Sequence, residues 1–390
     1  MSRMDAPLRI AHVHPISLDL YGHDDLEFGT RARYILSNLA AAQARMGDRP
    51  AVHLLTSGPS HRMEVDGVDV VFHRCIQPPR RSGLHVRFAR QLAPGLLAAL
   101  RRETCDVVHF HGIRSLHAMF AAVAHRTRRT GLPLVGHDQG ARPVGRIARA
   151  LEAYGLRRTD IALAGNPDAL EALARLGVPR SALHLVPSGV DPQLFRPEPR
   201  DPPSRDGPFR ILVVSRLSEE KDPLTMADAA ALLAARGRRF TLEVIGTGPL
   251  RGEVERRLRE GGVDVRFTDY VAQTELGSRY RAADALLLTS LSEGSNQVTI
   301  EAQSCGLPIV ASDIPGIREN ARGAGGLVPP RDAAGFAAAL ERLMDDPNEW
   351  QRCRERALGN ARGLDWDTIA GRLREIYAAV IGEDRGDRVR

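Results

Sequence analysis

Short apolar runs alternate with longer helical patterns along most of this 390-residue chain. The first run covers residues 8–15, and residues 29–46 follow it with their apolar side chains on one face of a helix. This alternation favours parallel strands joined by crossover helices, which is the doubly wound α/β architecture. It predicts further strands at 51–56, 68–73, 106–111, 132–137, 160–165, 183–187, 210–215, 240–245, 263–267, 284–289 and 307–312.

A proline-rich polar segment, residues 191–208, divides the chain. Such composition is typical of linkers, and the chain is long enough for two domains. We therefore expect an N-terminal domain over 1–190 and a C-terminal domain over 209–365. The remaining segment, 366–390, should carry one amphipathic helix over 366–381 and a charged tail. That helix either completes the core of the C-terminal domain or returns to the N-terminal domain.

The composition of the chain indicates its cellular compartment and the kinds of partner it can bind. The net charge is +6, but all basic residues except Lys221 are arginines and only 5% of residues are aromatic, so we expect no nucleic-acid partner. No apolar run approaches the roughly 20 residues that a membrane span needs, and residues 1–7 lack the apolar segment of a secretory signal. The four cysteines lack metal-site spacing, so we expect reduced thiols and a cytoplasmic protein.

Residues 289–306 read as a strand end, a loop and the start of a helix. Gly294 breaks the pattern, and Ser295 or Asn296 can cap the helix that follows. The free N–H groups of a helix N-terminus suit a phosphate. Two carboxylates, Glu293 and Glu301, frame this loop. They contact the two ends of a long ligand, or they lie in a surface loop and on a solvated helix face.

Two cations follow the strand predicted at 210–215. Arg216 and Lys221 lie where ligands bind in open α/β folds, at the carboxyl end of a parallel strand. They are suited to neutralising a leaving diphosphate. The alternative is a pair of solvated surface charges beside Glu219 and Glu220.

The run from Glu293 to Glu319 resembles the nucleotide-sugar signature of the retaining glycosyltransferases of the GT-B fold, known as family 4. The matching positions are Glu293, Glu301-Ala302, Cys305-Gly306-Leu307-Pro308 and Gly316-Ile317-Arg318-Glu319. Residues 186–197 resemble the linker signature of that family, and 215–221 its Arg…Glu-Lys motif. The resemblance implies two Rossmann-like domains with a cleft between them and a C-terminal helix that crosses back to the first domain.

The resemblance also implies site residues. Glu293, His137, Arg216 and Lys221 would be catalytic: Glu293 and His137 orient the hexose, and the two cations stabilise the diphosphate. Glu301 would hold the ribose hydroxyls. The other positions expected to bind the donor are Gly29, His111, Ser215, Gly246, Gly248, Tyr270, Val271, Gly294, Ser295, Asn296 and Gln297.

The histidines allow other interpretations. His137 and His111 either line the donor site or are strand-end side chains satisfied by the backbone. The pairs His12/His14 and His109/His111 share strand faces, as metal ligands do. The sequence places no third or fourth ligand, and the family generally needs no metal. We therefore expect no metal and no cofactor.

The first loop departs from the family pattern. Phe28-Gly29 stands where a Gly-Gly pair is usual, and the loop carries four acidic residues that are expected beside the acceptor: Asp19, Asp24, Asp25 and Glu27. They favour a cationic acceptor such as an aminocyclitol, or they pair with local arginines. The basic segment 80–102 either docks weakly on an anionic membrane or packs on its own sheet.

Together with the resemblance, these patterns predict a retaining transferase that moves a hexose from a nucleoside-diphosphate sugar, with a UDP-sugar favoured, to a hydroxyl acceptor. The acceptor would be a glycan, a lipid or a small molecule. The leaving phosphate oxygen would take the acceptor proton. The alternatives are a nucleotide-sugar epimerase or hydrolase of the same fold and a sugar-nucleotide-binding protein without turnover. The sequence leaves the base, the sugar, the acceptor and the oligomeric state open.

Overall fold

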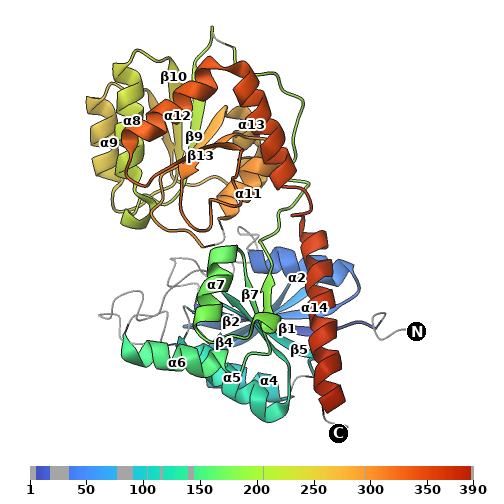
Figure 1. Ribbon diagram of the computed structural model, residues 1–390. Helices are drawn as coiled ribbons and strands as arrows, with labels where there is room; N and C mark the ends of the chain where they lie inside the picture. Colours follow the sequence, from blue (N-terminus) through green and yellow to red (C-terminus); the bar gives the residue numbers. More distant parts are fainter. Residues whose placement is uncertain are drawn as a thin grey trace. The chain divides into compact units, whose positions relative to one another are not determined.

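The computed structural model describes residues 6–17, 35–76, 91–102, 104–114, 117–138, 145–204, 206–294 and 296–387. The chain forms two compact units (Figure 1). Unit 1 consists of Met1–Gly189 and Trp366–Arg390, and unit 2 consists of Val190–Asp365.

Unit 1 is built on a sheet with the strand order β3-β4-β2-β1-β5-β6-β7-β8 among its described residues. The paired strands run parallel except at β3, which is antiparallel to β4. The strands are β1 (Arg9–Ser17), β2 (Arg49–Thr56), β3 (His61–Val65), β4 (Val68–Arg74), β5 (Val107–His111), β6 (Leu134–Asp138), β7 (Ile161–Ala164) and β8 (Leu183–Leu185).

Edge strand β3 was not predicted from the sequence. Its residues are largely polar, so it lacks the apolar run that marks the other strands. The turn that joins it to β4 is Asp66-Gly67, and both residues have positive φ, as a two-residue hairpin requires. The Asp-Gly pair before an alternating apolar pattern was the available signal.

Helices cover both faces of this sheet (Figure 1). On one face, strand residues such as Val13 and Phe110 share an apolar core with Leu100, Phe120 and residues of two further helices. On the other face, Ala40 packs on Val52, Leu54 and Phe72. The helices are α2 (Ile35–Arg45), α4 (Pro94–Arg102), α5 (His117–Thr130), α6 (Arg146–Leu156), α7 (Pro167–Arg175) and α14 (Trp366–Asp387).

The C-terminal helix α14 packs on α2 of unit 1 and is longer than the helix expected over 366–381. Trp366 leaves no space at Gly189, where an added Cβ would lie 2.6 Å from the indole. Arg374 pairs with the buried Asp48 at 3.0 Å. Tyr377 is fully buried. At the start of α14 the contact is the apolar packing of Trp366, and further along the helix it is the directional ion pair of Arg374 with Asp48.

Unit 2 contains a parallel sheet with the order β11-β10-β9-β12-β13-β14 among the described residues. This order reverses direction between β9 and β12, as in Rossmann folds. The strands are β9 (Phe209–Val214), β10 (Phe240–Ile245), β11 (Val265–Thr268), β12 (Ala285–Leu288), β13 (Ile309–Ser312) and β14 (Gly325–Val328). The short β14 was not predicted, because its Gly-Gly start lacks a strand pattern.

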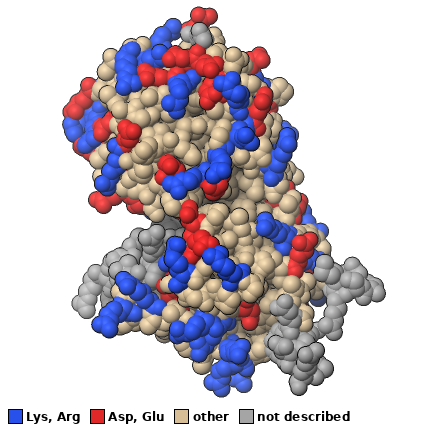
Figure 2. Space-filling model, in the orientation of Figure 1, with Lys and Arg blue, Asp and Glu red and all other residues tan. Residues whose placement is uncertain are grey.

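Two apolar cores lie on the two faces of this sheet. Met226, Phe336 and Trp350 belong to one core, and Tyr280 and Ile300 belong to the other. The helices are α8 (Pro223–Ala235), α9 (Arg251–Glu260), α10 (Gln273–Ala282), α11 (Gln297–Ser304), α12 (Ala333–Asp345) and α13 (Pro347–Asn360). Acidic and basic side chains are interspersed over the face of this unit that Figure 2 shows.

The segment interpreted as a linker, 191–208, packs on unit 2. Phe195 is buried beside Tyr280, with ring centroids 6.0 Å apart. Arg200 donates to the carbonyl of Arg281 at 2.8 Å and also bonds the carboxylate of Asp284. The segment therefore continues the structure of unit 2 after Val190.

Among the described ion pairs of unit 2, those of Asp284 should contribute most to the free energy of unfolding. Its buried carboxylate accepts hydrogen bonds from Arg200 and from the backbone N–H and guanidinium of Arg210. Replacing Asp284 by Ala would leave these donors without an acceptor, and we expect a loss of about 3 kcal/mol in the free energy of unfolding of unit 2. Denaturant unfolding measures this loss.

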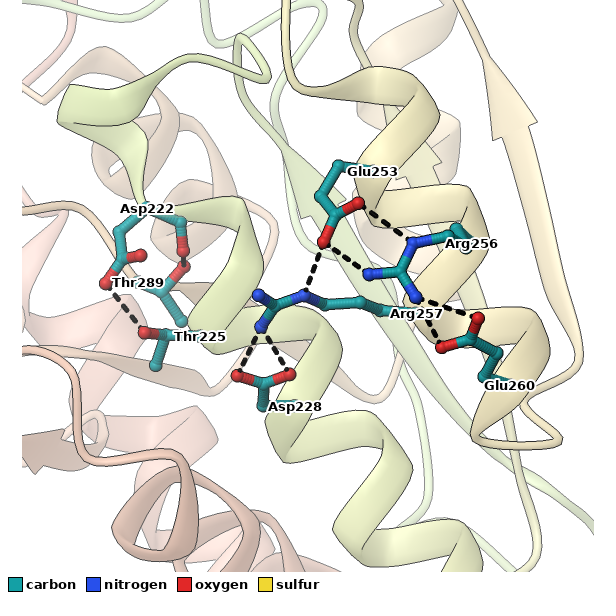
Figure 3. A network of polar contacts seen from close by, with 8 residues as sticks. All are labelled: Asp222, Thr225, Asp228, Glu253, Arg256, Arg257, Glu260 and Thr289. Atoms are coloured by element: carbon teal, nitrogen blue, oxygen red, sulfur yellow. Dashed lines mark hydrogen bonds and ion pairs between the residues drawn. The ribbon is translucent and has the colours of Figure 1, made fainter.

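Asp228 provides the matched control. It pairs with Arg257 at 2.8 Å on the surface between α8 and α9, where its side chain is 48% exposed (Figure 3). Asp228→Ala should cost less than about 1 kcal/mol, because solvent screens the pair. Equal losses in the two variants would contradict a special role for Asp284.

Candidate functional site

Three loops of unit 2 meet where the strand order reverses. The loops after β9 and β10 are in direct contact: an added Cβ at Gly246 would lie 1.9 Å from the carbonyl oxygen of Ser215, and one at Gly248 would lie 2.4 Å from that of Leu217. Only glycine permits this approach, and Gly246 also has a φ of 141°. The Gly-Thr-Gly-Pro loop is therefore more than an ordinary turn.

The loop after β9 is also joined to the end of β12. Asp222 has a left-handed φ of 44°, which turns the chain into α8. Its carboxylate accepts from Thr225 Oγ1 at 2.7 Å, and its carbonyl accepts from Thr289 Oγ1 at 2.8 Å (Figure 3). These bonds hold Lys221 at the edge of the sheet, beside the loop that carries Glu293.

Lys221 and Glu293 form an ion pair. The Lys221 Nζ lies 2.7 Å from Glu293 Oε1, and both side chains are mostly buried. Ser290 Oγ donates to the same carboxylate oxygen at 2.6 Å. The alternative of two solvated surface charges is therefore wrong for Lys221 and Glu293. The sequence analysis did not single out Ser290, because one serine before a loop carries no distinctive signal.

Arg216 has different surroundings. Its side chain is 71% exposed and pairs with Glu220 at 2.9 Å. This is the surface pairing that the sequence offered as the alternative to a diphosphate-binding role. Arg216 is next to Ser215 at the loop entrance and is separate from the Lys221–Glu293 pair in this structure.

Glu301 lies inside unit 2 and not on a solvated face. It is 4% exposed, and it accepts from Tyr280 Oη at 3.1 Å and from Gln273 Nε2 at 3.3 Å. Burial raises the pKa of this carboxyl to about 7. Neither Tyr280 nor Gln273 was predicted, because both belong to another helix, α10.

The N-terminus of α11 lies between the two glutamates in the chain. Asn296 caps it by accepting from Thr299 N at 3.1 Å, and its own Nδ2 is buried with no partner in the described part of the chain. Gly294 is packed closely, because an added Cβ at Gly316 would lie 2.5 Å from its carbonyl oxygen. Gln297 begins the helix. The arrangement offers donors to an anionic or carbonyl-bearing ligand.

Two predicted residues lie after β11. Tyr270 is 64% exposed, whereas Val271 packs against the core that contains Tyr280. Tyr270 thus lies after β11 with most of its side chain exposed.

In unit 1 the two predicted histidines have unequal surroundings. His137, the next-to-last residue of β6, is partly exposed, but its Nδ1 is buried without a partner among the described residues. Burial lowers its pKa to about 4. His111 is 2% exposed, and its Nε2 lies 3.1 Å from His12 Nδ1. Its side chain is bonded to another histidine and does not face solvent.

Several predicted residues lie outside the described residues. They are Gly29, Ser295 and the acidic residues Asp19, Asp24, Asp25 and Glu27. The first part of the basic segment 80–102, up to residue 90, is also outside, but its last part forms α4, where Leu96 and Leu100 are buried and Arg101 and Arg102 are exposed. That part packs on its own unit. No described helix is long and apolar enough to cross a bilayer.

The chain matches two family models. Residues 208–346 match the model described as glycosyl transferases group 1, and residues 33–194 match the model described as glycosyltransferase family 4. D-inositol 3-phosphate glycosyltransferase 1 of Catenulispora acidiphila is 31% identical over 357 residues, which cover 82% of this chain and 83% of that protein. A D-inositol 3-phosphate glycosyltransferase of an Arthrobacter species is 32% identical, with 85% and 81% covered.

Solved structures show the same fold. Sucrose-phosphate synthase from Thermosynechococcus elongatus has a TM-score of 0.73 at 19% identity, with 96% of this chain and 100% of that chain covered. HepE from Anabaena, in complex with UDP-glucose, has a TM-score of 0.70 at 17% identity, with 95% and 100% covered.

Two Rossmann-like units of this kind define a glycosyltransferase of the GT-B fold, and the fold prediction is confirmed. The chain belongs to glycosyltransferase family 4.

The raised pKa of Glu301 should make stability depend on pH. Between pH 4.5 and about 7 the folded protein keeps a proton on Glu301 that the unfolded chain has released. The stabilising contribution is therefore complete below pH 4.5 and is lost as the pH rises through 7. We expect the stability of the wild type to fall by about 3 kcal/mol across this window relative to Glu301→Gln.

Denaturant unfolding of both proteins at a series of pH values measures this difference. Glu260→Gln is the control, because this glutamate is 61% exposed on α9 and its loss should leave the profile unchanged. Parallel profiles for wild type and Glu301→Gln would contradict a carboxyl that stays protonated near neutral pH.

Proposed function

We propose that this glycosyltransferase moves a hexose from a nucleoside-diphosphate sugar to a hydroxyl acceptor with retention of the anomeric configuration. The observation that carries the proposal is the ion pair between Lys221 and Glu293 at the carboxyl edge of the unit 2 sheet. The only lysine of the chain lies at this edge, where ligands bind in doubly wound folds. An isolated, mostly buried ammonium suits a diphosphate oxygen as a compact charge.

The donor would replace the ion pair between Lys221 and Glu293. A diphosphate arriving at Lys221 competes with Glu293 for the ammonium, so Glu293 becomes free to accept hydrogen bonds from hexose hydroxyls. Ser290, bonded to the same carboxylate oxygen, limits how Glu293 can turn. Donor binding thus exchanges the ion pair of Lys221 with Glu293 for one with the diphosphate, and hydroxyl groups of the hexose and of Ser290 hydrogen-bond the Glu293 carboxylate.

The remaining residues of unit 2 supply contacts along the nucleotide. Glu301 is held by Tyr280 and Gln273 in a position to accept ribose hydroxyls, and Asn296 Nδ2 is an unused buried donor for a phosphate oxygen. The exposed Arg216 can move to the leaving group, because its pair with Glu220 is solvated. Tyr270 and Val271 are suited to the base. His137 of unit 1 would contact the hexose.

Retention requires the acceptor to enter on the face from which the diphosphate leaves. In the proposed reaction the C1–O bond to the diphosphate breaks, Lys221 and Arg216 stabilise the charge on the leaving oxygen, and that oxygen takes the proton of the acceptor hydroxyl as the new C1–O bond forms. Preorganised cations contribute several kcal/mol to such a step. No metal takes part in the proposed step.

For the donor we favour a UDP-sugar, as bound to the Anabaena neighbour. For the acceptor we favour a cyclitol or cyclitol phosphate, because relatives of similar length are named D-inositol 3-phosphate glycosyltransferases. An aminocyclitol is the second acceptor to test, on account of the four acids of the first loop. Weak membrane contact through 80–102 stays a prediction.

The test is nucleoside-diphosphate release from UDP-, GDP-, ADP- and dTDP-sugars, with and without inositol phosphates, aminocyclitols and neutral sugars. Lys221→Ala should lower acceptor-dependent release at least about 100-fold, which corresponds to about 2.7 kcal/mol of transition-state stabilisation. Arg236→Ala is the control and should keep full activity, because it removes only a surface pair between the residue that follows α8 and Glu341 on α12.

The other outcomes identify the alternatives. Release without acceptor would favour an epimerase or hydrolase, and tight donor binding without release would favour a binding protein. The anomeric configuration of the product, read by NMR, tests retention separately, because inversion would exclude the same-face mechanism.

A further inference from the structure

The face of the unit 1 sheet covered by α2 carries three buried histidines from two neighbouring strands. His12 on β1 is paired in register with His109 on β5, and His111 follows two residues later on the same face. All three are almost fully buried, at 0%, 0% and 2% exposure. The sequence offered two histidine pairs and no third ligand, and the strand pairing supplies it.

The ring nitrogens of the three side chains converge. One nitrogen from each residue lies within 4.8 Å of the other two. His12 Nδ1 and His111 Nε2 are 3.1 Å apart, and the rings of His109 and His111 are stacked with centroids 4.1 Å apart. Nitrogen ligands about 2.0–2.1 Å from a tetrahedral metal are roughly 3.4 Å from one another. The cluster is therefore close to the size that such an ion requires.

In His12 and His109, the ring nitrogen that points away from the cluster contacts a hydrogen-bonding partner, as is usual for metal ligands. His12 Nε2 lies 2.6 Å from Gln43 Oε1, and His109 Nδ1 lies 2.5 Å from Tyr377 Oη. Each of these contacts fixes one nitrogen and turns the other toward the cluster, which is how histidine ligands are usually oriented. His109 Nε2 is then left buried with no hydrogen-bond partner in the described chain, which is costly without a ligand.

We propose that His12, His109 and His111 bind one divalent transition-metal ion, of which Zn²⁺ is the natural candidate, inside unit 1. Imidazole ligands suit Zn²⁺, and neutral histidines in a tetrahedral arrangement are typical of its sites. His137 is the candidate for the fourth position, since its buried Nδ1 also has no partner in the described chain and its ring centroid is 5.5 Å from that of His109.

The ion would be structural. It would join β1 to β5, and through Tyr377 it would fix the helix α14. The cluster is closed to solvent at all three ligands, so the ion has no open face for substrate. None of the three ligands takes part in the proposed donor contacts, and His137 would use Nδ1 for the ion and Nε2 for the hexose.

The same sheet provides a matched control. His53 Nδ1 and His73 Nε2 are 3.0 Å apart and buried, but they lie on the opposite face, because His53 is in register with Val13, the neighbour of His12. This pair belongs to none of the three-ligand groups of the described residues. Removing His53 disturbs a buried histidine pair without touching the proposed ligands.

The experiment uses the full chain without an affinity tag, stripped with a chelator and then titrated with Zn²⁺ or Co²⁺. Wild type and His53→Phe should each bind one ion per chain, measured by elemental analysis, and Co²⁺ should give the visible absorption of a tetrahedral site. His109→Phe keeps the ring volume but removes both nitrogens, and its affinity should fall at least about 100-fold, as removal of a ligand exceeds the roughly 10–100-fold cost of losing an outer contact.

Tyr377→Phe keeps the test decisive if His109→Phe fails to fold. It retains all three ligands and removes only the hydroxyl at His109 Nδ1, so affinity should fall by about tenfold. In wild type, Zn²⁺ should also raise the thermal unfolding midpoint, because it binds only the folded unit. Substoichiometric binding in wild type, or equal losses in His53→Phe and Tyr377→Phe, would overturn the proposal.

Discussion

The pairing of β9 with both β10 and β12 is the constraint on which the donor side of this protein depends. β9 is hydrogen-bonded to two strands that continue in opposite directions across the sheet. The loops that follow these strands consequently leave the same edge side by side. Lys221 and Glu293, 72 residues apart in the chain, meet at 2.7 Å for this reason. Two glycines, Gly246 and Gly248, allow the third loop to approach the first.

The two glutamates near α11 have different surroundings. Glu293 faces an ammonium and a hydroxyl at the mouth of the loop, so its charge has a partner. Glu301 has neutral partners, Tyr280 and Gln273, and burial raises its pKa to about 7.

Much of the fold was predictable from the sequence, because buried parallel strands leave apolar runs such as 285–288 between helical patterns. β3 and β14 were missed because each is a short edge strand with polar or glycine residues. The site was predictable in part: a long motif placed Glu293 and Glu301 in it, and a second motif, at 215–221, added Lys221. Tyr280 and Ser290 were not predictable, because a hydrogen bond between elements depends on packing that no local pattern records. The same holds for the His12–His111 contact, which depends on the pairing of β1 with β5.

Unit 1 is closed by contacts that specify one position for α14. Apolar packing alone, as at Trp366 and Ile369, tolerates small shifts along a helix axis. The ion pair between Arg374 and buried Asp48 does not tolerate such a shift. Asp48 is held in place because it also accepts from Leu8 N at 2.9 Å, so a shift of α14 would separate Arg374 from this carboxylate. Tyr377 adds a second directional contact, to His109. A polar interior beneath α14, with or without an ion, therefore fixes where the end of the chain attaches, and a purely apolar face would leave this position less defined.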